Sequence, residues 1–324
     1  MPPEKPVDVL AARPREAETS FGSALRGIAA MVACQFAFVL NDTLNKLASE
    51  SLPMGEIIFI RGLCATFLVS VIVIALGLHR QLPLLWNRLV AVRVIGELGG
   101  TYFFLLPLFH MPIGNVMIIF QAVPLTVTAG AALFFREAVG WRRWGAVTVG
   151  FIGVLIVVRP GLSGFDAYGL LVLISVLFVA FRDLATRAMP LAIPTLCLTL
   201  ATAVAVTVMG GLMGFTEVWV LPSSAVLAEV AGASVFLTIG YGTSIMAMRN
   251  GDMSVTASFR YVGVVFAIAS GFAVWGDVPD LPTIVGSVVI IGAGLYTLYR
   301  ERKLARAGRP LIAAPASIDS ATGA

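Results

Sequence analysis

The chain has 324 residues, of which 58% are hydrophobic and only 12% are charged, and its mean hydropathy is +0.93. A water-soluble domain has about a quarter of its residues charged, so this composition excludes a soluble fold and indicates a protein embedded in a lipid bilayer. The net charge of +4 is small, and we expect no nucleic-acid partner.

Apolar runs of roughly 20 residues, the length that crosses the hydrocarbon core as a helix, recur along the chain. Strand-like alternation is absent, which argues against an outer-membrane barrel. We therefore predict an all-α membrane protein with ten transmembrane helices, at residues 24–47, 54–78, 89–109, 113–135, 145–158, 167–188, 195–215, 226–247, 253–275 and 282–299. The fifth span is short, and Trp141 and Trp144 predict an earlier start because indoles favour the membrane interface.

The basic residues predict the orientation, because Lys and Arg accumulate in cytoplasmic loops. With the N-terminus inside, 18 of the 22 cations lie in or beside inner segments, and only Arg159 lies in an outer loop. Both termini are thus predicted to be cytoplasmic, in a bacterial inner membrane. Residues 1–23 lack the apolar region of a signal peptide and are predicted to be a tail, and residues 301–324 a basic and then disordered one.

An internal repeat appears at a shift of 141 residues. This shift aligns Asn41-Asp42 with Arg182-Asp183, Lys46 with Arg187, and Pro53 with Pro194. We predict two five-helix repeats, at residues 24–160 and 161–300. Five is an odd number of spans, so the second repeat enters the membrane from the opposite side and the repeats are inverted. Such a pair suits alternating access.

Charged residues inside the spans are the first candidates for a site, because placing them there costs at least about 2.5–3.5 kcal/mol each. Asp42 and Lys46 are four residues apart on one helical face, and Asp183 and Arg187 repeat the arrangement. One interpretation makes the two pairs gates or substrate contacts at opposite ends of a path. The other makes them structural ion pairs.

Further candidates lie in the second, third and ninth spans. Arg61 is expected to pair with Glu56 or Asp42, or to contact a substrate carboxylate, and Glu97 has Arg93 one turn earlier as a structural partner. Arg260 lies beside Tyr261, and a buried arginine there favours a role in a cavity over snorkelling to the inner surface.

Uncharged candidates are Gln121 and Tyr102. Gln121 precedes Pro124 in mid-span, where proline frees the carbonyl of Phe120, either for substrate or simply as a kink. Tyr102 follows two glycines and is expected to form part of an aromatic wall. The three cysteines fall inside spans without metal-ligand spacing, so neither a metal nor a cofactor is expected.

Several strings between Gly114 and Gly161 carry a family resemblance: Phe120-Gln121-Ala122-Val123-Pro124, Phe135-Arg136-Glu137, Trp141-Arg142-Arg143-Trp144-Gly145 and Gly150-Phe151-Ile152-Gly153-Val154. They resemble the end of an EamA-type unit of the drug/metabolite transporter superfamily. The second half echoes them but has Gly276-Asp277 where Gly-Glu is common. The resemblance implies a ten-helix carrier whose central cavity excludes helices five and ten. Within this superfamily, the sequence resembles most the bacterial S-adenosylmethionine uptake transporters and amino-acid exporters.

The function predicted is therefore secondary transport of a small metabolite, such as an amino acid or an S-adenosylmethionine-like zwitterion, by a monomer or weak homodimer. The alternatives are a channel and an intramembrane enzyme. Gly161-Leu162-Ser163-Gly164 matches the rhomboid-protease string, but His79 and His110 lie at span ends with no reason to approach it, so no catalytic residue is expected. No phosphate-binding loop motif occurs, which argues against direct ATP drive.

Overall fold

The computed structural model describes residues 13–135, 141–159, 167–190, 192–250 and 259–306. Every regular element in these ranges is helical. In chain order they are α1 (Arg13–Ala48), α2 (Met54–Ala75), the 3-10 helix η1 (Leu78–Leu85), α3 (Arg88–His110), α4 (Ile113–Phe120), α5 (Val123–Phe134), α6 (Trp141–Val158), α7 (Ala167–Arg187), α8 (Thr195–Met213), α9 (Ser224–Asn250), η2 (Phe259–Tyr261), α11 (Val262–Trp275) and α12 (Leu281–Arg306).

The predicted fold class is confirmed. Eight helical segments are long and apolar enough to cross a membrane, with α4 and α5 together forming one of them. Two shorter apolar segments, Trp144–Val158 and Phe259–Trp275, supply the fifth and ninth positions. The early start predicted for the fifth span is correct, since α6 begins at Trp141. The predicted ninth span began at residue 253, so its first residues lie outside the described ranges.

Two local differences from the prediction have clear causes. The fourth span is interrupted at Gln121-Ala122, because Pro124 in the first turn of α5 has no N–H to continue α4. The second span ends at Ala75, earlier than expected, where Gly77 adopts the left-handed backbone (φ 69°) and starts η1. Met54 and Arg88, by contrast, begin their helices within one residue of the predicted starts.

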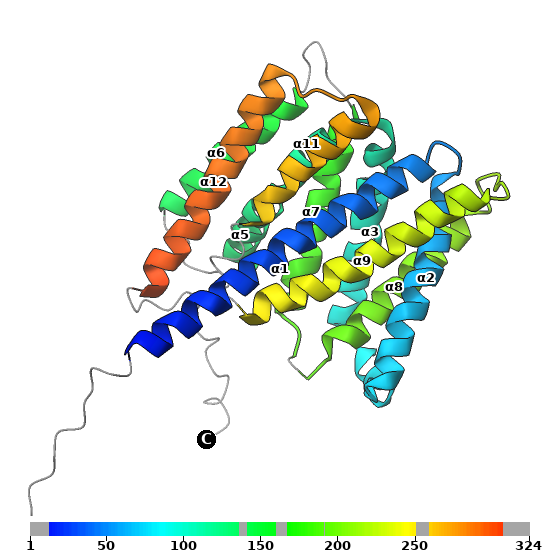
Figure 1. Cartoon of the computed structure of the whole chain (residues 1–324), viewed down its shortest axis with the longest axis horizontal. Helices are drawn as coiled ribbons and strands as arrows, with labels where there is room; N and C mark the ends of the chain where they lie inside the picture. Colours follow the sequence, from blue (N-terminus) through cyan, green and yellow to red (C-terminus); the bar gives the residue numbers. More distant parts are fainter. Residues whose placement is uncertain (1–12, 136–140, 160–166, 191, 251–258, 307–324) are drawn as a thin grey trace, which may run out of the picture.

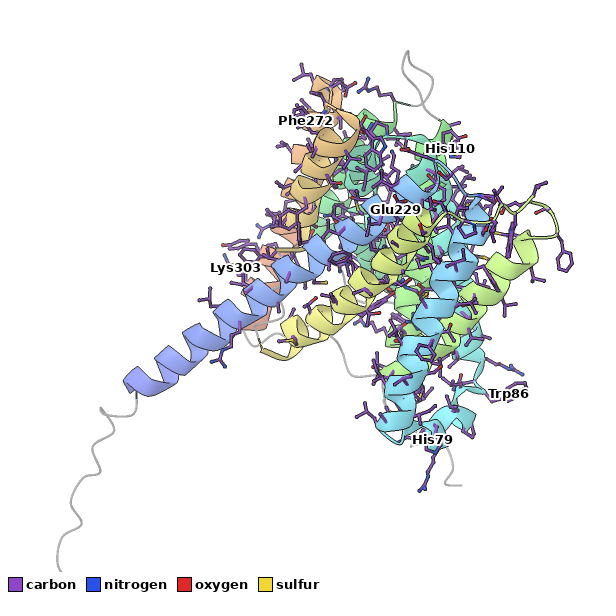
Figure 2. The ribbon with its side chains drawn as sticks, turned by 45° about the vertical axis from the view of Figure 1, so that its right-hand side comes forward. His79, Trp86, His110, Glu229, Phe272 and Lys303 are labelled. Carbon is purple, nitrogen blue, oxygen red and sulfur yellow. The ribbon has the colours of Figure 1, made fainter. Side chains whose placement is uncertain are left out.

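The helices run antiparallel in succession, so the bundle has two distinct ends. We call the end where α1 begins and α12 ends the tail end, and the opposite one the far end (Figure 1). His79 and Trp86 mark the tail end and His110 the far end (Figure 2). The arginine- and lysine-rich segments therefore lie at the tail end.

Packing follows the internal repeat. The most extensive contacts are α1 with α9, α3 with α7, α2 with α8, and α6 with α12. In the predicted repeats, α1, α2, α3 and α6 correspond to α7, α8, α9 and α12. Exchanging equivalent helices therefore turns the α1–α9 pair into the α7–α3 pair, and leaves the α2–α8 and α6–α12 pairs unchanged. Thr66 and Thr207, which are 141 residues apart, place their hydroxyl oxygens 3.1 Å from each other between α2 and α8. Such a contact is expected where a pseudo-two-fold axis relates two inverted repeats.

Two three-helix bundles result from this exchange. Bundle A consists of α1, α9 and α11, and bundle B consists of α7, α3 and the α4–α5 helix. Helix α2 packs against α9 of bundle A and α8 packs against α3 of bundle B, while α6 and α12 pair with each other at one side (Figure 1). The largest buried cluster joins the bundles, with Val39 and Ala267 from bundle A and Leu108, Ile113 and Val172 from bundle B. Apolar packing therefore holds the bundles together.

Candidate functional site

Charged side chains gather between bundles A and B, in the middle and tail-end half of the protein. Arg182 of α7 donates to Glu97 of α3, with Nη1 and Oε2 3.1 Å apart, and it also contacts Asp183 at 2.8 Å. Arg93 lies one turn from Glu97, with its Nη1 3.8 Å from the same carboxylate oxygen. Two arginines thus neutralise two carboxylates on the face of bundle B.

Arg61 of α2 lies nearby and differs from these arginines. Its nearest electrostatic partners are Asp42 of α1 and Tyr241 of α9, followed by Glu97. Among the described residues it forms no direct ion pair. Arg61 is thus a guanidinium whose charge is only partly balanced, and we call the space it shares with Arg182, Glu97 and Tyr241 the central site.

Tyr241 forms the bundle A side of the central site. Its side chain interacts electrostatically with Glu97, Arg182 and Arg61, and its ring stands edge-on to Phe38 of α1 at a centroid distance of 5.6 Å. The residue is 43% exposed. The central site therefore offers cations on one side and an aromatic wall on the other.

The ion pairs expected within each Asp-x-x-x-cation motif are corrected by the structure. Asp42 accepts a hydrogen bond from Asn41 Nδ2 at 2.8 Å, and Lys46 points elsewhere. Asp183 accepts from Arg182 Nε at 2.9 Å. Arg187 places its guanidinium over the ring of Phe135, 5.7 Å from the centroid. In both motifs the partner of the acid is the preceding residue, because that side chain already lies beside it.

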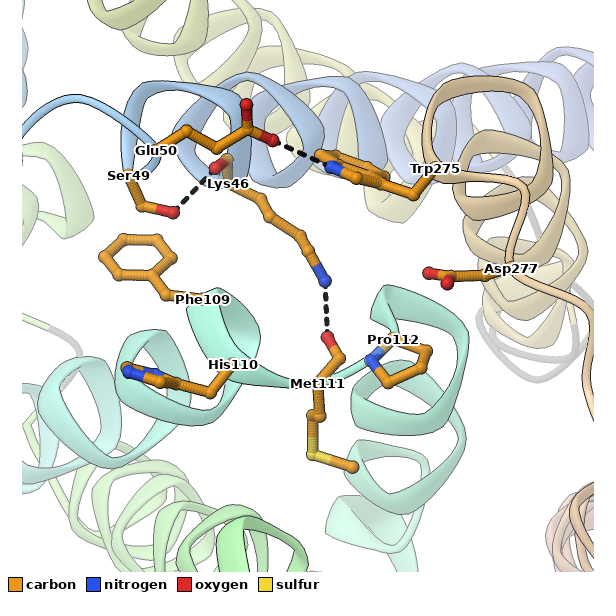
Figure 3. A pocket seen from close by; sticks show the side chains of 9 residues that line it. All are labelled: Lys46, Ser49, Glu50, Phe109, His110, Met111, Pro112, Trp275 and Asp277. Atoms are coloured by element: carbon orange, nitrogen blue, oxygen red, sulfur yellow. Dashed lines mark hydrogen bonds between the residues drawn. The ribbon is translucent and has the colours of Figure 1, made fainter.

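Lys46 instead connects the bundles at the far end. Its Nζ donates to the main-chain oxygen of Met111, at the end of α3, at 2.5 Å (Figure 3). It also lies over the Trp275 ring, 5.0 Å from the centroid, and the Trp275 indole donates to Glu50 at 2.9 Å. These groups line a pocket of about 320 Å³ together with His110 and Asp277.

A second polar contact at the far end joins α6 to α12. Arg159, just after α6, donates to Asp280 at 2.5 Å, and this contact with hydrogen bonds from Thr283 lowers the pKa of Asp280 to about 2. Both residues lie in loops between the spans. Glu56, considered above as a partner of Arg61, instead accepts from the main-chain N–H of Val220 at 3.0 Å.

The two cation–ring contacts are equivalent under the repeat. Lys46 corresponds to Arg187 at a shift of 141, and Phe135 corresponds to Trp275 at a shift of 140. Each cation lies on the first helix of its repeat, and each ring lies at the end of the fourth helix of the other. The Lys46 contact is at the far end and the Arg187 contact at the tail end. Lys46 is buried whereas Arg187 is exposed.

The remaining predicted residues lie near the break in each fourth helix. The main-chain oxygen of Arg260 in η2 accepts from Gln35 at 2.7 Å and from Gln121 at 3.3 Å. The Arg260 side chain is exposed, within electrostatic range of Cys34 of α1. Tyr261 is buried with its hydroxyl against Gly294 of α12, where any larger residue would overlap it.

Tyr102 lies in the packed face between α3 and α7, edge-on to Phe103, which stacks on Phe178. The aromatic wall of the central site comes from Tyr241 and Phe38 instead. Sequence reasoning missed Tyr241, and it assigned Arg182 to an inner segment. The Gly240-Tyr241-Gly242 string and the placement of Arg182 opposite Asn41 in the repeat were the available signals.

Within the described part of the chain, no three His, Cys, Asp or Glu side chains are arranged to hold a metal ion. The Gly161–Gly164 string considered for an intramembrane protease lies outside the described residues. His110, one of the two histidines in the chain, stacks on Tyr168 at a centroid distance of 4.6 Å and lines the far-end pocket.

Comparison with known proteins agrees with this architecture. Residues 25–159 match the EamA-like transporter family. The chain is 29% identical to the pseudopaline exporter of Pseudomonas aeruginosa over 86% of its own length and 97% of the exporter. It is 25% identical to the S-adenosylmethionine uptake transporter of Rickettsia prowazekii, over 82% of this chain and 89% of the relative. It is 23% identical to the riboflavin transporter of Vibrio cholerae, over 88% and 97%.

A solved crystal structure shares the fold, with a TM-score of 0.59 at 18% identity over 85% of this chain and 98% of the other. The relatives are transporters that match almost from end to end, which sets aside the intramembrane enzyme considered as an alternative. The chain is a multi-pass membrane protein whose residues 25–159 match the EamA-like transporter family and whose relatives over most of its length are transporters.

Proposed function

We propose that the protein is a secondary carrier that moves a small zwitterionic metabolite, an amino acid or an S-adenosylmethionine-like compound, by alternating access. The observation that carries this proposal is the central site, where Arg61 has only a partly balanced charge and forms no direct ion pair among the described residues. A channel does not need a substrate-binding charge placed between two equivalent bundles, whereas a carrier does.

The site chemistry supports a substrate with a carboxylate. Arg93 and Arg182 form ion pairs with Glu97 and Asp183. Arg61 is therefore the guanidinium available to donate two hydrogen bonds to a substrate carboxylate. Glu97 is the acid best placed for a substrate cation, and Tyr241 with Phe38 supplies an aromatic face for a ring or a cation. Relatives named for S-adenosylmethionine and pseudopaline transport agree with a small organic substrate.

Differences between equivalent residues support alternating access. Asp42 is 7% exposed, whereas the side chain of its counterpart Asp183 is 37% exposed. Lys46 is likewise buried and Arg187 exposed. Two copies of one sequence motif differ in this way when one end of the path is closed and the other open. The far-end motif is the more buried of the two in this conformation, and we propose that the other conformation exchanges the two environments.

The gates follow from these contacts. Lys46 on bundle A holds Met111 on bundle B, so it latches the far end. Arg187 and Phe135 occupy the equivalent position for the tail end. The repeats at residues 24–160 and 161–300 are the two copies. The tail end faces the cytoplasm, as the distribution of cations favours, and the protein acts as a monomer or weak homodimer.

The test is counterflow in liposomes that contain the purified protein. Labelled S-adenosylmethionine, amino acids and nucleosides are offered outside against the same unlabelled compound inside. Arg61→Met is compared with Arg80→Met, which removes an exposed cation at the tail end and serves as the matched control. Losing a charge-assisted contact worth about 1.5–3 kcal/mol lowers transport about 10- to 150-fold.

Two outcomes would overturn the proposal. Wild-type rates in Arg61→Met would remove the carboxylate site. Flux that neither saturates nor shows counterflow would indicate a channel rather than a carrier. Arg61→Lys refines the result, because it keeps the charge and loses the bidentate geometry, so intermediate transport is expected.

A further inference from the structure

A polar cluster in α1 is not explained by the central site alone. Asn41, Asp42 and Asn45 are 3%, 7% and 0% exposed, within the membrane span Leu25–Ala48. Asn45 Nδ2 donates to the main-chain oxygen of Asn41 at 2.8 Å and to its side-chain oxygen at 3.2 Å. Asn41 Nδ2 in turn donates to Asp42. The three side chains form one hydrogen-bonded chain along a single helical face.

This chain contains more acceptors than donors. Asn45 Oδ1 is fully buried and has no hydrogen-bond partner, and Asp42 brings two further acceptor oxygens. Buried polar groups in folded proteins are almost always paired, so an orphan acceptor one turn from a buried carboxylate marks a place where a positive hydrogen is missing. Asp42 is the titratable member of this cluster and can bind a proton there.

The charged groups that the structure describes around Asp42 do not form an ion pair with its carboxylate, so the carboxylate remains available to bind a proton. Arg61 is the cation with which Asp42 interacts, through space and without a direct ion pair. Lys46, on the same helix, is held by Met111. Among the side chains that the structure describes, the other titratable groups on the elements packed against α1 are Glu229 and Tyr241 of α9, Arg260 and Tyr261 of η2, and Arg88, Arg93, Glu97, Tyr102 and His110 of α3.

On this basis, and resting on the proposed function above, we infer that Asp42 binds the coupling proton, with Asn41, itself held by Asn45, fixing the carboxyl group and Arg61 linking it to the substrate. The charge balance explains the linkage. A substrate carboxylate at Arg61 beside an ionised Asp42 puts two anions on one cation. When the proton forms an O–H bond with Asp42, Arg61 and the substrate carboxylate make a neutral pair. The proton then leaves Asp42 on the side where the substrate is released, so both move in the same direction.

The first test needs no substrate. Ser49, in the far-end pocket, is replaced by cysteine in a background lacking Cys34, Cys64 and Cys197, and its labelling rate is measured in the purified full-length protein. Each rate is divided by that of the denatured protein at the same pH. Lowering the pH from about 8 to about 6 should change this ratio several-fold, because proton binding shifts the balance between conformations.

In Asp42→Asn the labelling ratio should not respond to pH, whereas Asp42→Glu should still respond, with a shifted midpoint. Glu229→Gln removes another partly buried acid and should behave as the unsubstituted protein. A pH response that survives in Asp42→Asn would overturn the inference. So would a response to sodium at constant pH without any to protons, since it would assign the cluster to a sodium ion. If Asp42→Asn does not fold, a response in Asp42→Glu identical in midpoint to that of the aspartate would overturn it instead.

The second test uses labelled S-adenosylmethionine as the probe in liposomes. Asp42→Asn should keep counterflow, which needs no net proton movement, and lose accumulation driven by a pH gradient. Equal gradient-driven accumulation in both proteins would overturn the coupling role. Absence of counterflow in the unsubstituted protein would count against the proposed substrate, while the labelling experiment would still decide the role of Asp42.

Discussion

Asp42 and Asp183 occupy equivalent positions in the two repeats, yet their neighbours give them different electrostatic states. In each case the preceding side chain donates to Oδ1, Asn41 at 2.8 Å and Arg182 at 2.9 Å. The hydrogen-bond geometry is therefore the same in both repeats, but the donor is neutral in the first repeat and positively charged in the second. Asp183 forms an ion pair that continues through Arg182 to Glu97, whereas Asp42 receives only an amide hydrogen.

This difference shows how a duplicated bundle gains distinct functions. A carboxylate neutralised by a neighbouring arginine is suited to fixing charges in place at the central site. A carboxylate paired only with an amide keeps an affinity for a mobile positive charge. Two copies of one motif therefore give a fixed element in bundle B and a titratable one in bundle A.

The largest effect is expected when Arg182, which precedes Asp183, is replaced by asparagine, the residue that precedes Asp42 in the first repeat. Arg182→Asn leaves Glu97 and Asp183 with Arg93 as their remaining cation. Breaking a buried ion pair costs about 3–5 kcal/mol, and because the Arg182 side chain is 25% exposed we expect about 2–4 kcal/mol. Thermal unfolding in detergent measures the loss, with Arg80→Asn as the exposed control. Equal stability of the two variants would mean that the two aspartates are electrostatically alike.

A second change addresses the close helix contact at the far end. A Cβ on Gly210 of α8 would lie 2.6 Å from the main-chain nitrogen of Phe59 and 2.9 Å from the oxygen of Gly55 in α2. Gly210→Ala should therefore separate these helices and cost about 1–3 kcal/mol. Thermal unfolding and the Ser49→Cys labelling rate should both change. Gly242→Ala, where the added carbon meets nothing within 4 Å, is the control and should leave both unaltered.

The two cation–ring contacts give a third, smaller effect, and its sign distinguishes the ends. Each contact contributes about 0.5–2 kcal/mol to closure of its own end, so its loss shifts the conformational balance several-fold. Lys46→Gln should raise labelling of Ser49→Cys at the far end, and Arg187→Gln should lower it. Shifts of the same sign in both variants would show that the contacts are structural and do not act as gates.

The smallest effect is expected at the loop pair that joins α6 to α12. The pKa of Asp280 is lowered to about 2 by Arg159 and Thr283, so its stabilising contribution is complete above the usual value of about 3.9 and is lost as the pH falls through about 2. Asp280 is largely solvent-exposed, and screening limits the contribution to less than about 1 kcal/mol. Asp280→Asn should lower thermal stability slightly at neutral pH and should match the unsubstituted protein in strong acid. A deficit that persists in acid would exclude the charge as its cause.

The sequence by itself determined the membrane class, the ten spans and the shift of 141 residues. These features depend on hydropathy, on segment length and on short sequence motifs. Hydropathy and length can be read within a single helix, and the motifs recur at a fixed spacing along the chain. It also identified Arg61 and Glu97 as intramembrane charges, because a charge in an apolar run is visible without any knowledge of its neighbours.

Only the tertiary structure decided which charges meet. Spacing within one helix predicted that Asp42 would pair with Lys46, but Lys46 is long enough to reach the Met111 carbonyl on another helix, where it joins two bundles. Tyr241 and Arg182 enter the central site because α9 and α7 pack against helices from the other half of the chain. Helical periodicity fixes the face on which a side chain lies. The partner it meets there depends on which helices pack together, and that is decided by the exchange of helices between the two repeats.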